Sequence, residues 1–501
     1  MLAKLKEFFS SRRYPAFLVG GYLRDSLLSL TPERDLDIAV SGDSQRVGRE
    51  LAQVMGGVFV PLSPAHGVAR VVVTDPETGS VGTGGAPGGR WIVDLAGFSG
   101  SIEEDLARRD FTINALALPV QGWASPGPSD LVIDPFNGRQ DLGRKNIRAV
   151  TPQVFQDDPG RLMRAVRLAA SLSFRLEPET ARLVRGEAGR VTQVSGERVR
   201  DELLAILALD GARGHLEVLD RLDLLCRIVP ELAETKGVDQ PKEHYWDVWG
   251  HLLHTVETAE RVTKGHQNSP VYSMVHWTAE TDAYFSREVS DGHTRKTFLK
   301  LTALFHDIAK PEAKQIDETG RTRFPAHSEL GADAAAKRLT QLRIGSHGIA
   351  MVTRIIEEHL RPVHMMQGVE RPSGRAIYRF FRDLGEAAVD TLYMSLADYL
   401  GAKGPYLDLD DWGNHARMMA HVLQVGMQPP ASKEAGKEAS KEAIRPVNGH
   451  DLMEHFNLNP GPLIGRILAG IDEARAAGEI ATREEALASA AKMLERHRER
   501  A

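Results

Sequence analysis

The sequence contains one cysteine in 501 residues, Cys226, so an internal disulfide is excluded and a reducing compartment is favoured. Cys226 follows two leucines, a context that predicts a buried packing thiol. No apolar stretch reaches the roughly 20 residues needed to span a bilayer. The first residues, MLAKLKEFFSSRRY, lack the apolar core and cleavage site of a secretory signal. The sequence therefore predicts a cytoplasmic protein without a membrane partner.

The chain also lacks a strong charge of either sign. Its 62 Lys and Arg residues stand against 68 Asp and Glu residues, which gives a net charge of −6. This balance argues against a protein that coats a polyanion with an extended basic surface, although it is compatible with a local basic groove. The length predicts three or four domains, and a hydrophobic content of 42% with 26% charged residues is typical of globular proteins.

The hydrophobic pattern changes near residue 150. Before it, apolar runs predict strands at residues 17–19, 36–40, 69–73 and 91–94, a helix at 44–55 and a Gly-rich hairpin loop at 78–90. After it, helical spacing continues almost to the end, interrupted by a charged low-complexity linker at 429–446. We expect an α+β head over residues 1–150, helical domains after it and a small helical tail over 447–501.

Two aspartates one residue apart, Asp35 and Asp37, are the most informative feature of the head. Side chains two apart on a strand share a face, so the two carboxylates can bind hard divalent cations together. A solvated pair on an edge strand is the alternative. It does not explain why Asp37 interrupts an apolar strand, where an unpaired carboxylate is costly. We therefore expect a divalent-metal site for phosphoryl transfer, with Asp94 as a candidate third ligand.

A glycine pair precedes the two aspartates. Gly20 and Gly21 at a strand-to-helix turn would let backbone N–H groups approach a triphosphate, and Arg24 offers a fork of donors to phosphate.

Five successive segments carry a family resemblance: LVGGYLRDSLL, ERDLDIAV, EEDLARRDFTINALAL, DPFNGRQDL and DDPGRLMRAVRLAASLSF. In this order, over residues 15 to 235, they resemble the motifs of the bacterial class II tRNA nucleotidyltransferase and poly(A) polymerase family. The resemblance implies a polymerase-β-like nucleotidyltransferase head and a helical neck over 151–240. It also implies addition of CC or CCA to the tRNA 3′ end from CTP and ATP, without a template and with release of pyrophosphate. Poly(A) polymerase is a rival within the same class.

The resemblance also implies roles for single residues. Asp35 and Asp37 become the Mg²⁺ ligands and the catalytic pair. The implied nucleotide contacts are Gly20, Gly21, Arg24, Arg109, Asp158, Arg161, Arg164 and Arg167. Asp158 and Arg161 match a base-reading pair. Their i, i+3 spacing on an expected helix would place them on one face, where they could select C or A.

The kind of addition depends on a short stretch. Only residues 95–102 separate Asp94 from Glu103, where members of the family that add full CCA usually have a longer loop. The resemblance therefore favours CC addition. The Gly-rich tract at 78–90 could be a displaced substitute for that loop, which would restore CCA addition.

The segment LTALFHDIAK contains an adjacent His-Asp pair on an expected helix, a nitrogen and oxygen environment that suits divalent transition metals. With the histidines around it, the segment resembles the HD phosphohydrolase superfamily, and we expect this domain over residues 241–428. The implied metal ligands are His254, His306, Asp307, His327, His359 and Asp398. His251 and His364 are left out because the superfamily spacing favours His254 and His359.

Within this family, an HD domain implies hydrolysis of 2′,3′-cyclic phosphates or phosphomonoesters. Two alternatives remain open: a metal-stabilised scaffold without turnover, and a chain that is chiefly a phosphohydrolase with the head as an RNA-binding module. The segment at 447–468 resembles the helical region with which this family contacts tRNA.

Overall fold

The computed structural model describes residues 1–12, 14–63, 67–74, 89–122, 130–265, 268–369, 371–427 and 447–498. The chain forms two compact units, one of Met1–Leu209 with Glu217–Ile228 and one of Asp210–Leu216 with Val229–Ala501. The expected linker at 429–446 lies outside the described residues. So does the Gly-rich tract at 78–90, except for its last two residues. Within the described ranges, no helix is both long and apolar enough to cross a membrane.

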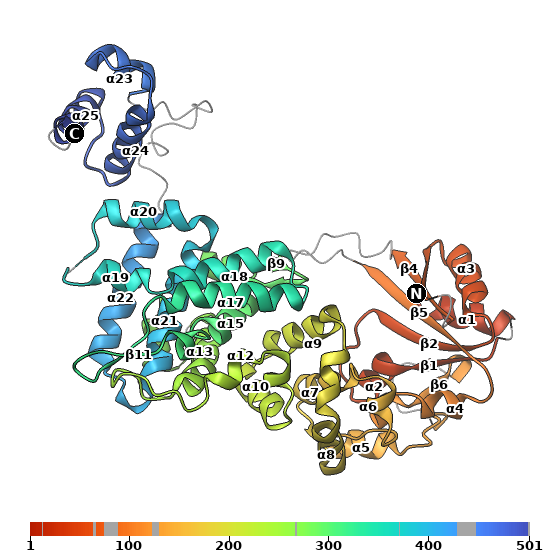
Figure 1. Cartoon of the computed structure of the whole chain (residues 1–501). Coiled ribbons are helices and arrows are strands. Elements are labelled where there is room, and N and C mark those ends of the chain that lie inside the picture. Colours follow the sequence, from red (N-terminus) through yellow and green to blue (C-terminus); the bar gives the residue numbers. More distant parts are fainter. Residues whose placement is uncertain are drawn as a thin grey trace. The chain divides into compact units, whose positions relative to one another are not determined.

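The first unit contains a six-stranded mixed sheet in the order β3-β4-β5-β2-β1-β6 (Figure 1). The strands are β1 (Ala16–Val19), β2 (Asp35–Ser41), β3 (Val58–Ser63), β4 (Val68–Thr74), β5 (Arg90–Phe98) and β6 (Ala117–Pro119). All four expected strands are present. β2 runs parallel to β5 and antiparallel to β1, so it is a central strand. The alternative of an edge-strand pair of aspartates is therefore wrong.

Helices pack on this sheet where the sequence supplies caps and an apolar face. The helices of the head are α1 (Leu2–Arg12), α2 (Gly20–Leu27), α3 (Ser44–Met55), α4 (Ile102–Ala107) and α5 (Gly138–Arg144). α3 has the expected bounds: the Asp43 side chain accepts hydrogen bonds from two N–H groups of its first turn, and Gly56 ends it with φ 63°. Ile102 and Leu106 of α4 join Val19 and Ala39 of the sheet in one buried cluster.

The rest of the first unit is helical. It contains α6 (Val154–Asp157), α7 (Arg161–Leu172), α8 (Pro178–Glu187), α9 (Gly196–Ala208) and α11 (Leu225–Ile228), and α7 packs on α9. The expected apolar stripe of α7, which includes Leu162 and Val166, is buried. Cys226 is only partly buried, with its Sγ 3.4 Å from an Asp220 carboxylate oxygen, so the prediction of a buried thiol is corrected.

The second unit is built around three buried helices. α13 (Val248–Val262) packs against both α15 (Arg295–Phe305) and α21 (Ala388–Lys403). α15 is buried along most of its length, including the charged residues Arg295 and Lys300, as expected for a helix at the centre of a domain. The outer helices are α12 (Glu231–Glu234), α14 (Ala279–Phe285), α16 (Lys310–Ala313), α17 (His327–Gln341), α18 (Ser346–Glu358), α19 (Arg361–Met366), α20 (Gly374–Leu384) and α22 (Leu409–Met427). α10 (Ala212–Arg221) is shared between the two units, which divide after Leu216.

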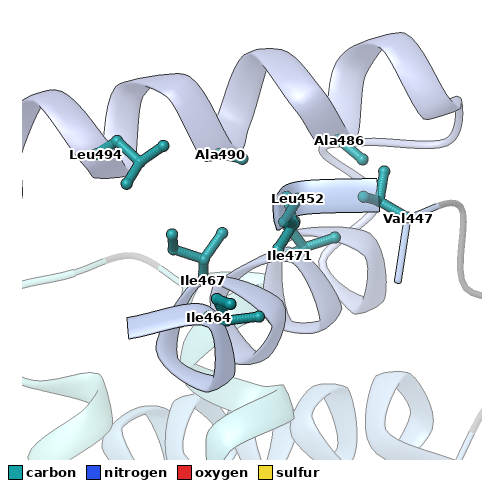
Figure 2. Packing of buried hydrophobic residues seen from close by; sticks show 8 residues of the cluster. All are labelled: Val447, Leu452, Ile464, Ile467, Ile471, Ala486, Ala490 and Leu494. Carbon is teal, nitrogen blue, oxygen red and sulfur yellow. The ribbon is translucent and has the colours of Figure 1, made fainter. Parts of the chain in front are cut away.

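Three helices form the C-terminal tail: α23 (Gly449–Phe456), α24 (Pro462–Ala476) and α25 (Arg483–Arg498). Their facing apolar side chains make a separate small core, in which Leu452, Ile467, Ile471 and Leu494 converge (Figure 2). α23 starts with a capping box between Asn448 and Asp451. The tail thus has its own core.

Candidate functional sites

The strand register brings the carboxylates of the head together. Asp37 on β2 lies directly opposite Asp94 on β5, and Asp35 occupies the same face two residues earlier. Burial, followed by the charges of Asp37 and Asp94, raises the pKa of Asp35 to about 6. Burial also raises the pKa of Asp37, against the opposing effect of Arg109 and Arg164. Such crowded oxygen donors fit a hard divalent cation, whose charge would relieve the repulsion.

Asp94 has a different partner from the other two carboxylates. Arg70 on β4 forms a bidentate ion pair with Asp94, and both nitrogen-to-oxygen distances are 2.8 Å. The candidate third ligand is therefore already neutralised by an arginine. Asp35 and Asp37 remain the carboxylates available to a cation.

The glycine pair supports Asp37 directly. Gly20 has φ +72°, and a Cβ atom there would lie 2.4 Å from an Asp37 carboxylate oxygen, so only glycine fits. The backbone N–H of Gly21 donates a hydrogen bond to Asp37. The turn thus holds the carboxylate against the start of α2, a role beyond the expected one of approaching phosphate.

A cavity of about 710 Å³ opens beside Asp37. Seven of the predicted residues line it: Gly20, Gly21, Asp37, Arg109, Asp158, Arg161 and Arg164. We call it the arginine-lined cavity. Arg24 is not among its lining residues: it pairs with Asp25 at 2.7 Å and donates to Asn114 at 3.0 Å. Arg167 also lies outside the lining and pairs with Glu202.

The predicted base-reading pair differs from expectation in one respect. Asp158 is not on a helix but in extended conformation, φ −146° and ψ 100°, between α6 and α7. Its two oxygens each accept a hydrogen bond from Arg198 of α9 at 2.8 Å, whereas Arg161 is 3.9 Å away and donates to the Arg108 carbonyl oxygen. The i, i+3 argument is therefore corrected, because Pro159 and Gly160 interrupt the helix there.

Arg198 is a residue that the sequence reasoning missed. Its hydrogen bonds are the main reason that the pKa of Asp158 lies below its usual range, so Asp158 is an ionised acceptor. Asp110 was missed as well: it pairs with Arg164 at 2.7 Å inside the arginine-lined cavity. Asp110 follows Arg109 in the sequence, so the motif itself could have indicated it; Arg198 is 40 residues from its partner and gave no local signal.

In the second unit, the His-Asp pair lies just after a helix. α15 ends at Phe305, and His306 is its C-cap. The pair therefore directly follows the helix instead of lying within it. His327 at the start of α17, His359 after the end of α18 and Asp398 within α21 lie next to His306 and Asp307.

His251, not His254, completes this group. The His251 Nε2 atom is 3.1 Å from His306 Nε2, 3.2 Å from an Asp307 oxygen and 3.0 Å from an Asp398 oxygen. His254 stacks on Trp246 at 4.0 Å and lies 3.1 Å from Arg213, so its choice as a ligand is corrected. The two histidines are one turn apart on α13, and spacing alone could not separate them. We call His251, His306, Asp307, His327, His359 and Asp398 the histidine cluster. His364 is exposed.

Three of the histidines are oriented in the same way. The Nδ1 atoms of His306, His327 and His359 each lie 2.6–2.9 Å from the carbonyl oxygen three residues earlier. A hydrogen bond from Nδ1–H to this carbonyl assigns the free lone pair to Nε2. Metal-binding histidines are commonly fixed in this way by their other ring nitrogen.

The donor atoms of the histidine cluster fit a divalent metal. His251, His306 and Asp307 offer atoms within 4.8 Å of one another, and so do Asp307, His327 and His359, so Asp307 is shared by both groups. The Asp307 Oδ1 and His327 Nε2 atoms are buried without a hydrogen-bond partner. Burial lowers the pKa of His359 to about 4. A neutral imidazole with mixed nitrogen and oxygen neighbours suits a transition metal.

The histidine cluster lies at a cavity of about 570 Å³ with basic residues in its wall. Lys310, Arg321, Arg323 and Lys403 line it, and Lys310 pairs with Asp307 at 2.6 Å. His244 lines it too, with a buried Nδ1 atom that has no partner. Burial, then Lys310, lowers the pKa of His244 to about 3, so this side chain is a neutral imidazole.

The two sites define the class of protein: a nucleotidyltransferase head followed by a domain with a buried histidine and aspartate metal site. Family models agree with this. A poly(A) polymerase head domain matches residues 16–148, and an HD domain matches 248–403. Models of an RNA-binding region of poly(A) polymerase and of a tRNA nucleotidyltransferase domain match 173–236 and 440–491. The last match begins inside the expected linker.

Curated relatives extend over nearly the whole chain. It is 32% identical to an A-adding tRNA nucleotidyltransferase of Deinococcus radiodurans, over 94% of each chain. It is 30% identical to a CC-adding tRNA nucleotidyltransferase of Thermus thermophilus, over 94% of this chain and 92% of the relative. The chain therefore belongs to the tRNA nucleotidyltransferase family and is an enzyme of that class.

Solved structures support the fold. A CCA-adding enzyme of Thermotoga maritima complexed with tRNA matches with a TM-score of 0.60 at 20% identity, over 98% of this chain and 94% of that one. A CCA-adding enzyme complexed with CTP matches with a TM-score of 0.62 at 20% identity, over 98% of this chain and 94% of that one. The combination of a sheet-containing head with mostly helical following domains is thus as expected.

Proposed function

We propose that the chain adds C residues to the 3′ end of tRNA from CTP, without a template, and stops after CC. The observation that carries the proposal is the arginine-lined cavity, which joins Asp37 to the ionised acceptor Asp158 and to Arg109, Arg161 and Arg164. This combination offers a cation site, cationic donors for a triphosphate and an acceptor for a base. The curated relatives bear A-adding and CC-adding names, so their names leave the choice open.

In the reaction, the tRNA 3′-oxygen forms a bond to the α-phosphorus of the nucleotide, and the bond from that phosphorus to the pyrophosphate breaks. Asp35 and Asp37 would hold Mg²⁺, which lowers the pKa of an attacking hydroxyl and neutralises charge on pyrophosphate. Arg109 and Arg164 face Asp37 closely enough to lower its pKa, so they are placed to bind the negatively charged nucleotide beside it.

Base selection is assigned to Asp158. An ionised carboxylate accepts a hydrogen bond from the exocyclic amine of cytosine or adenine, whereas uracil presents a carbonyl oxygen at that position. A site built to pair with a donor rejects a base that lacks it, because a buried polar group is then left unpaired. Arg161 lines the same cavity and donates to the Arg108 carbonyl oxygen in this structure; in the proposed reaction it would donate to the same base.

The limit to CC rests on the connection between β5 and α4. β5 ends at Phe98 and α4 begins at Ile102, so three residues join them. The connection is closed by a capping box between Ser101 and Glu104, which leaves no room for a long loop. The region at 75–88 lies outside the described residues, so the Gly-rich tract as a substitute remains the alternative that would give CCA.

The experiment is incubation of purified protein with tRNAs that end before the tail, after C and after CC, each with CTP or ATP alone. CTP should extend the first two substrates, and ATP should extend none of them. Addition of A to the tRNA ending in CC would overturn the CC limit. Long A tracts would identify a poly(A) polymerase instead.

A second function is favoured by the histidine cluster. Its Asp307 Oδ1 and His327 Nε2 atoms, which lie 3.3 Å apart without a hydrogen bond, and the basic residues of its cavity support hydrolysis of a phosphoester, with a divalent transition metal that would activate water. A 2′,3′-cyclic phosphate or a terminal phosphate blocks the hydroxyl that the head must extend, so removing it would prepare the substrate. Asp307→Ala should abolish hydrolysis of a 2′,3′-cyclic phosphate, and unchanged hydrolysis would exclude the cluster.

A further inference from the structure

Two tyrosines beside the histidine-cluster cavity are unusually exposed. Tyr245 is 42% exposed and Tyr406 is 69% exposed, and their ring centroids lie 5.0 Å apart at an interplanar angle of 81°. Both residues follow segments that line the cavity, since His244 precedes Tyr245 and Lys403 lies three residues before Tyr406. Aromatic side chains normally contribute buried area, so a solvent-facing pair beside a cavity needs an explanation.

The aromatic pair is held in a defined place. The Tyr245 N–H donates to the Ala402 carbonyl oxygen at 2.8 Å, which ties the two segments together. Gly404 has φ +51°, and a Cβ atom there would lie 2.9 Å from the Tyr245 ring, so the ring packs directly on a glycine backbone. The Tyr245 ring also meets Trp246 edge to face at 4.6 Å. These contacts fix the position of the Tyr245 ring, and the Tyr406 ring packs against it edge to face.

The group of ring contacts extends to His254, the histidine that was expected to bind metal. Trp246 lies parallel to His254 at 4.0 Å with an interplanar angle of 13°. His254 thus packs against the aromatic group formed by Tyr245, Tyr406 and Trp246. This gives His254 a role in the same region that does not involve metal coordination.

Four basic side chains line the cavity: Lys310, Arg321, Arg323 and Lys403. The first three pair with Asp307, Glu243 and Asp317, and the Lys403 ammonium lies 5.2 Å from the centroid of the Tyr399 ring. Aromatic faces combined with basic side chains are how proteins bind single-stranded nucleic acids: bases stack on the rings and phosphates meet the cations. A free mononucleotide would use the cavity alone.

We propose that Tyr245 and Tyr406 form a base-stacking platform for single-stranded RNA, which receives the nucleotide before the 3′ end while the terminal phosphate enters the histidine-cluster cavity. The inference rests on the proposed phosphohydrolase function and names its substrate class, an RNA end instead of a small phosphoester. The aromatic pair next to a cavity lined by Lys403 and by three ion-paired basic residues favours RNA over a protein partner, because stacking faces and phosphate-binding cations then lie close together.

The first test compares two substrates with the full-length protein. One is adenosine 2′,3′-cyclic phosphate, and the other is a trinucleotide with the same cyclic end. Wild-type protein should hydrolyse the trinucleotide with the higher kcat/KM, and Tyr406→Ala should lower that value about fivefold or more while the mononucleotide value stays the same. Tyr406→Phe keeps the aromatic face and should keep the preference. Equal values for both substrates in wild type, or an unchanged preference in Tyr406→Ala, would overturn the platform.

A second test reads binding without turnover. A short RNA with a 3′-phosphate and 5-iodouridine at the penultimate position is irradiated with the protein, and cross-linked peptides are mapped by mass spectrometry. Cross-links to Tyr245 or Tyr406 support the platform. Cross-links confined to residues outside 241–410 overturn it. If neither cyclic substrate is hydrolysed, the phosphohydrolase proposal fails, and this mapping still decides whether the tyrosines bind RNA.

Discussion

The acidic pair of the head and the histidine cluster both place carboxylates where a divalent cation would bind, but their surroundings differ. Asp37 lines the arginine-lined cavity, whereas Asp35, two residues earlier on the same strand, is not among its lining residues; the pKa values of both are raised by burial and by neighbouring carboxylates. In the cluster, His306 and Lys310 counter the burial of Asp307 and hold its pKa well below the usual range. In the head, burial and carboxylate repulsion thus outweigh the nearby arginines Arg70, Arg109 and Arg164, whereas in the cluster the positive partners of Asp307 outweigh its burial.

This difference suggests two ways of holding a metal. Oxygen donors in an open cavity suit Mg²⁺, which keeps several waters and binds together with nucleotide phosphates. Imidazoles fixed through Nδ1 suit a transition metal held before substrate arrives. We therefore expect the head to depend on added Mg²⁺ and the histidine cluster to retain its metal during purification.

The largest expected effect separates the two sites completely. Asp37→Asn should lower CMP incorporation by about 1,000-fold or more, because it removes one of the two carboxylates that would hold the cation, a contribution of several kcal/mol. Hydrolysis of a 2′,3′-cyclic phosphate by the same preparation should not change. Loss of both activities would contradict the account, because it would show that hydrolysis also depends on the site of the head.

Substitutions of two histidines on α13 test whether His251, and not His254, is the metal ligand. His251→Ala should lower cyclic phosphate hydrolysis by more than the roughly 10- to 100-fold that loss of a supporting residue costs. His254→Ala should leave hydrolysis of the mononucleotide within about twofold, because its ring contacts Trp246 and not the cluster. The reverse order of effects would restore His254 as the ligand.

Arg198 provides a finer test of the head. Its two hydrogen bonds orient Asp158, so Arg198→Ala should lower the kcat/KM for CTP about tenfold. The ratio of CTP to UTP incorporation should fall as well, because a carboxylate that is free to rotate discriminates less. Arg190→Ala, which removes an exposed arginine paired with Glu187, is the control. A lower rate with an unchanged CTP to UTP ratio would assign Arg198 a purely structural role.

The smallest expected effect concerns stability. The pKa of Asp35 is raised to about 6 in the folded protein, so the folded state binds more protons than the unfolded state between pH 4 and pH 6, and stability falls as the pH rises through that range. In a chelator at pH 7.5, Asp35→Asn should therefore raise the melting temperature of the head by about 1–3 °C. The gain should vanish near pH 4, and a gain that persists there would mean that the Asp35 charge is not its cause.

Local patterns predicted much of the head. An apolar run was enough to predict the central strand, helical spacing was enough to predict α3, and the i, i+2 spacing was enough to pair Asp35 with Asp37. The partner of Asp158 was not predictable in this way, because Arg198 comes from a helix 40 residues further on. The extended conformation of Asp158 follows from Pro159 and Gly160, which the i, i+3 argument did not take into account.

The histidine cluster shows a second limit. The resemblance to the HD superfamily pointed to His306, Asp307, His327, His359 and Asp398, which the structure brings together, but it offered two histidines one turn apart on α13. Which of them faces the cluster depends on how α13 rotates as it packs between α15 and α21, a property of the tertiary structure. The exposed tyrosines had no motif at all, because exposure is visible only once the chain is folded.

The most direct test of the account is the metal content of protein dialysed without chelator, measured by mass spectrometry for wild type, Asp37→Asn and His359→Ala. The account predicts that wild type and Asp37→Asn retain a transition metal, that His359→Ala loses it, and that all three need added Mg²⁺ to incorporate CMP. Retained metal that disappears in Asp37→Asn, or that is unaffected in His359→Ala, would contradict it.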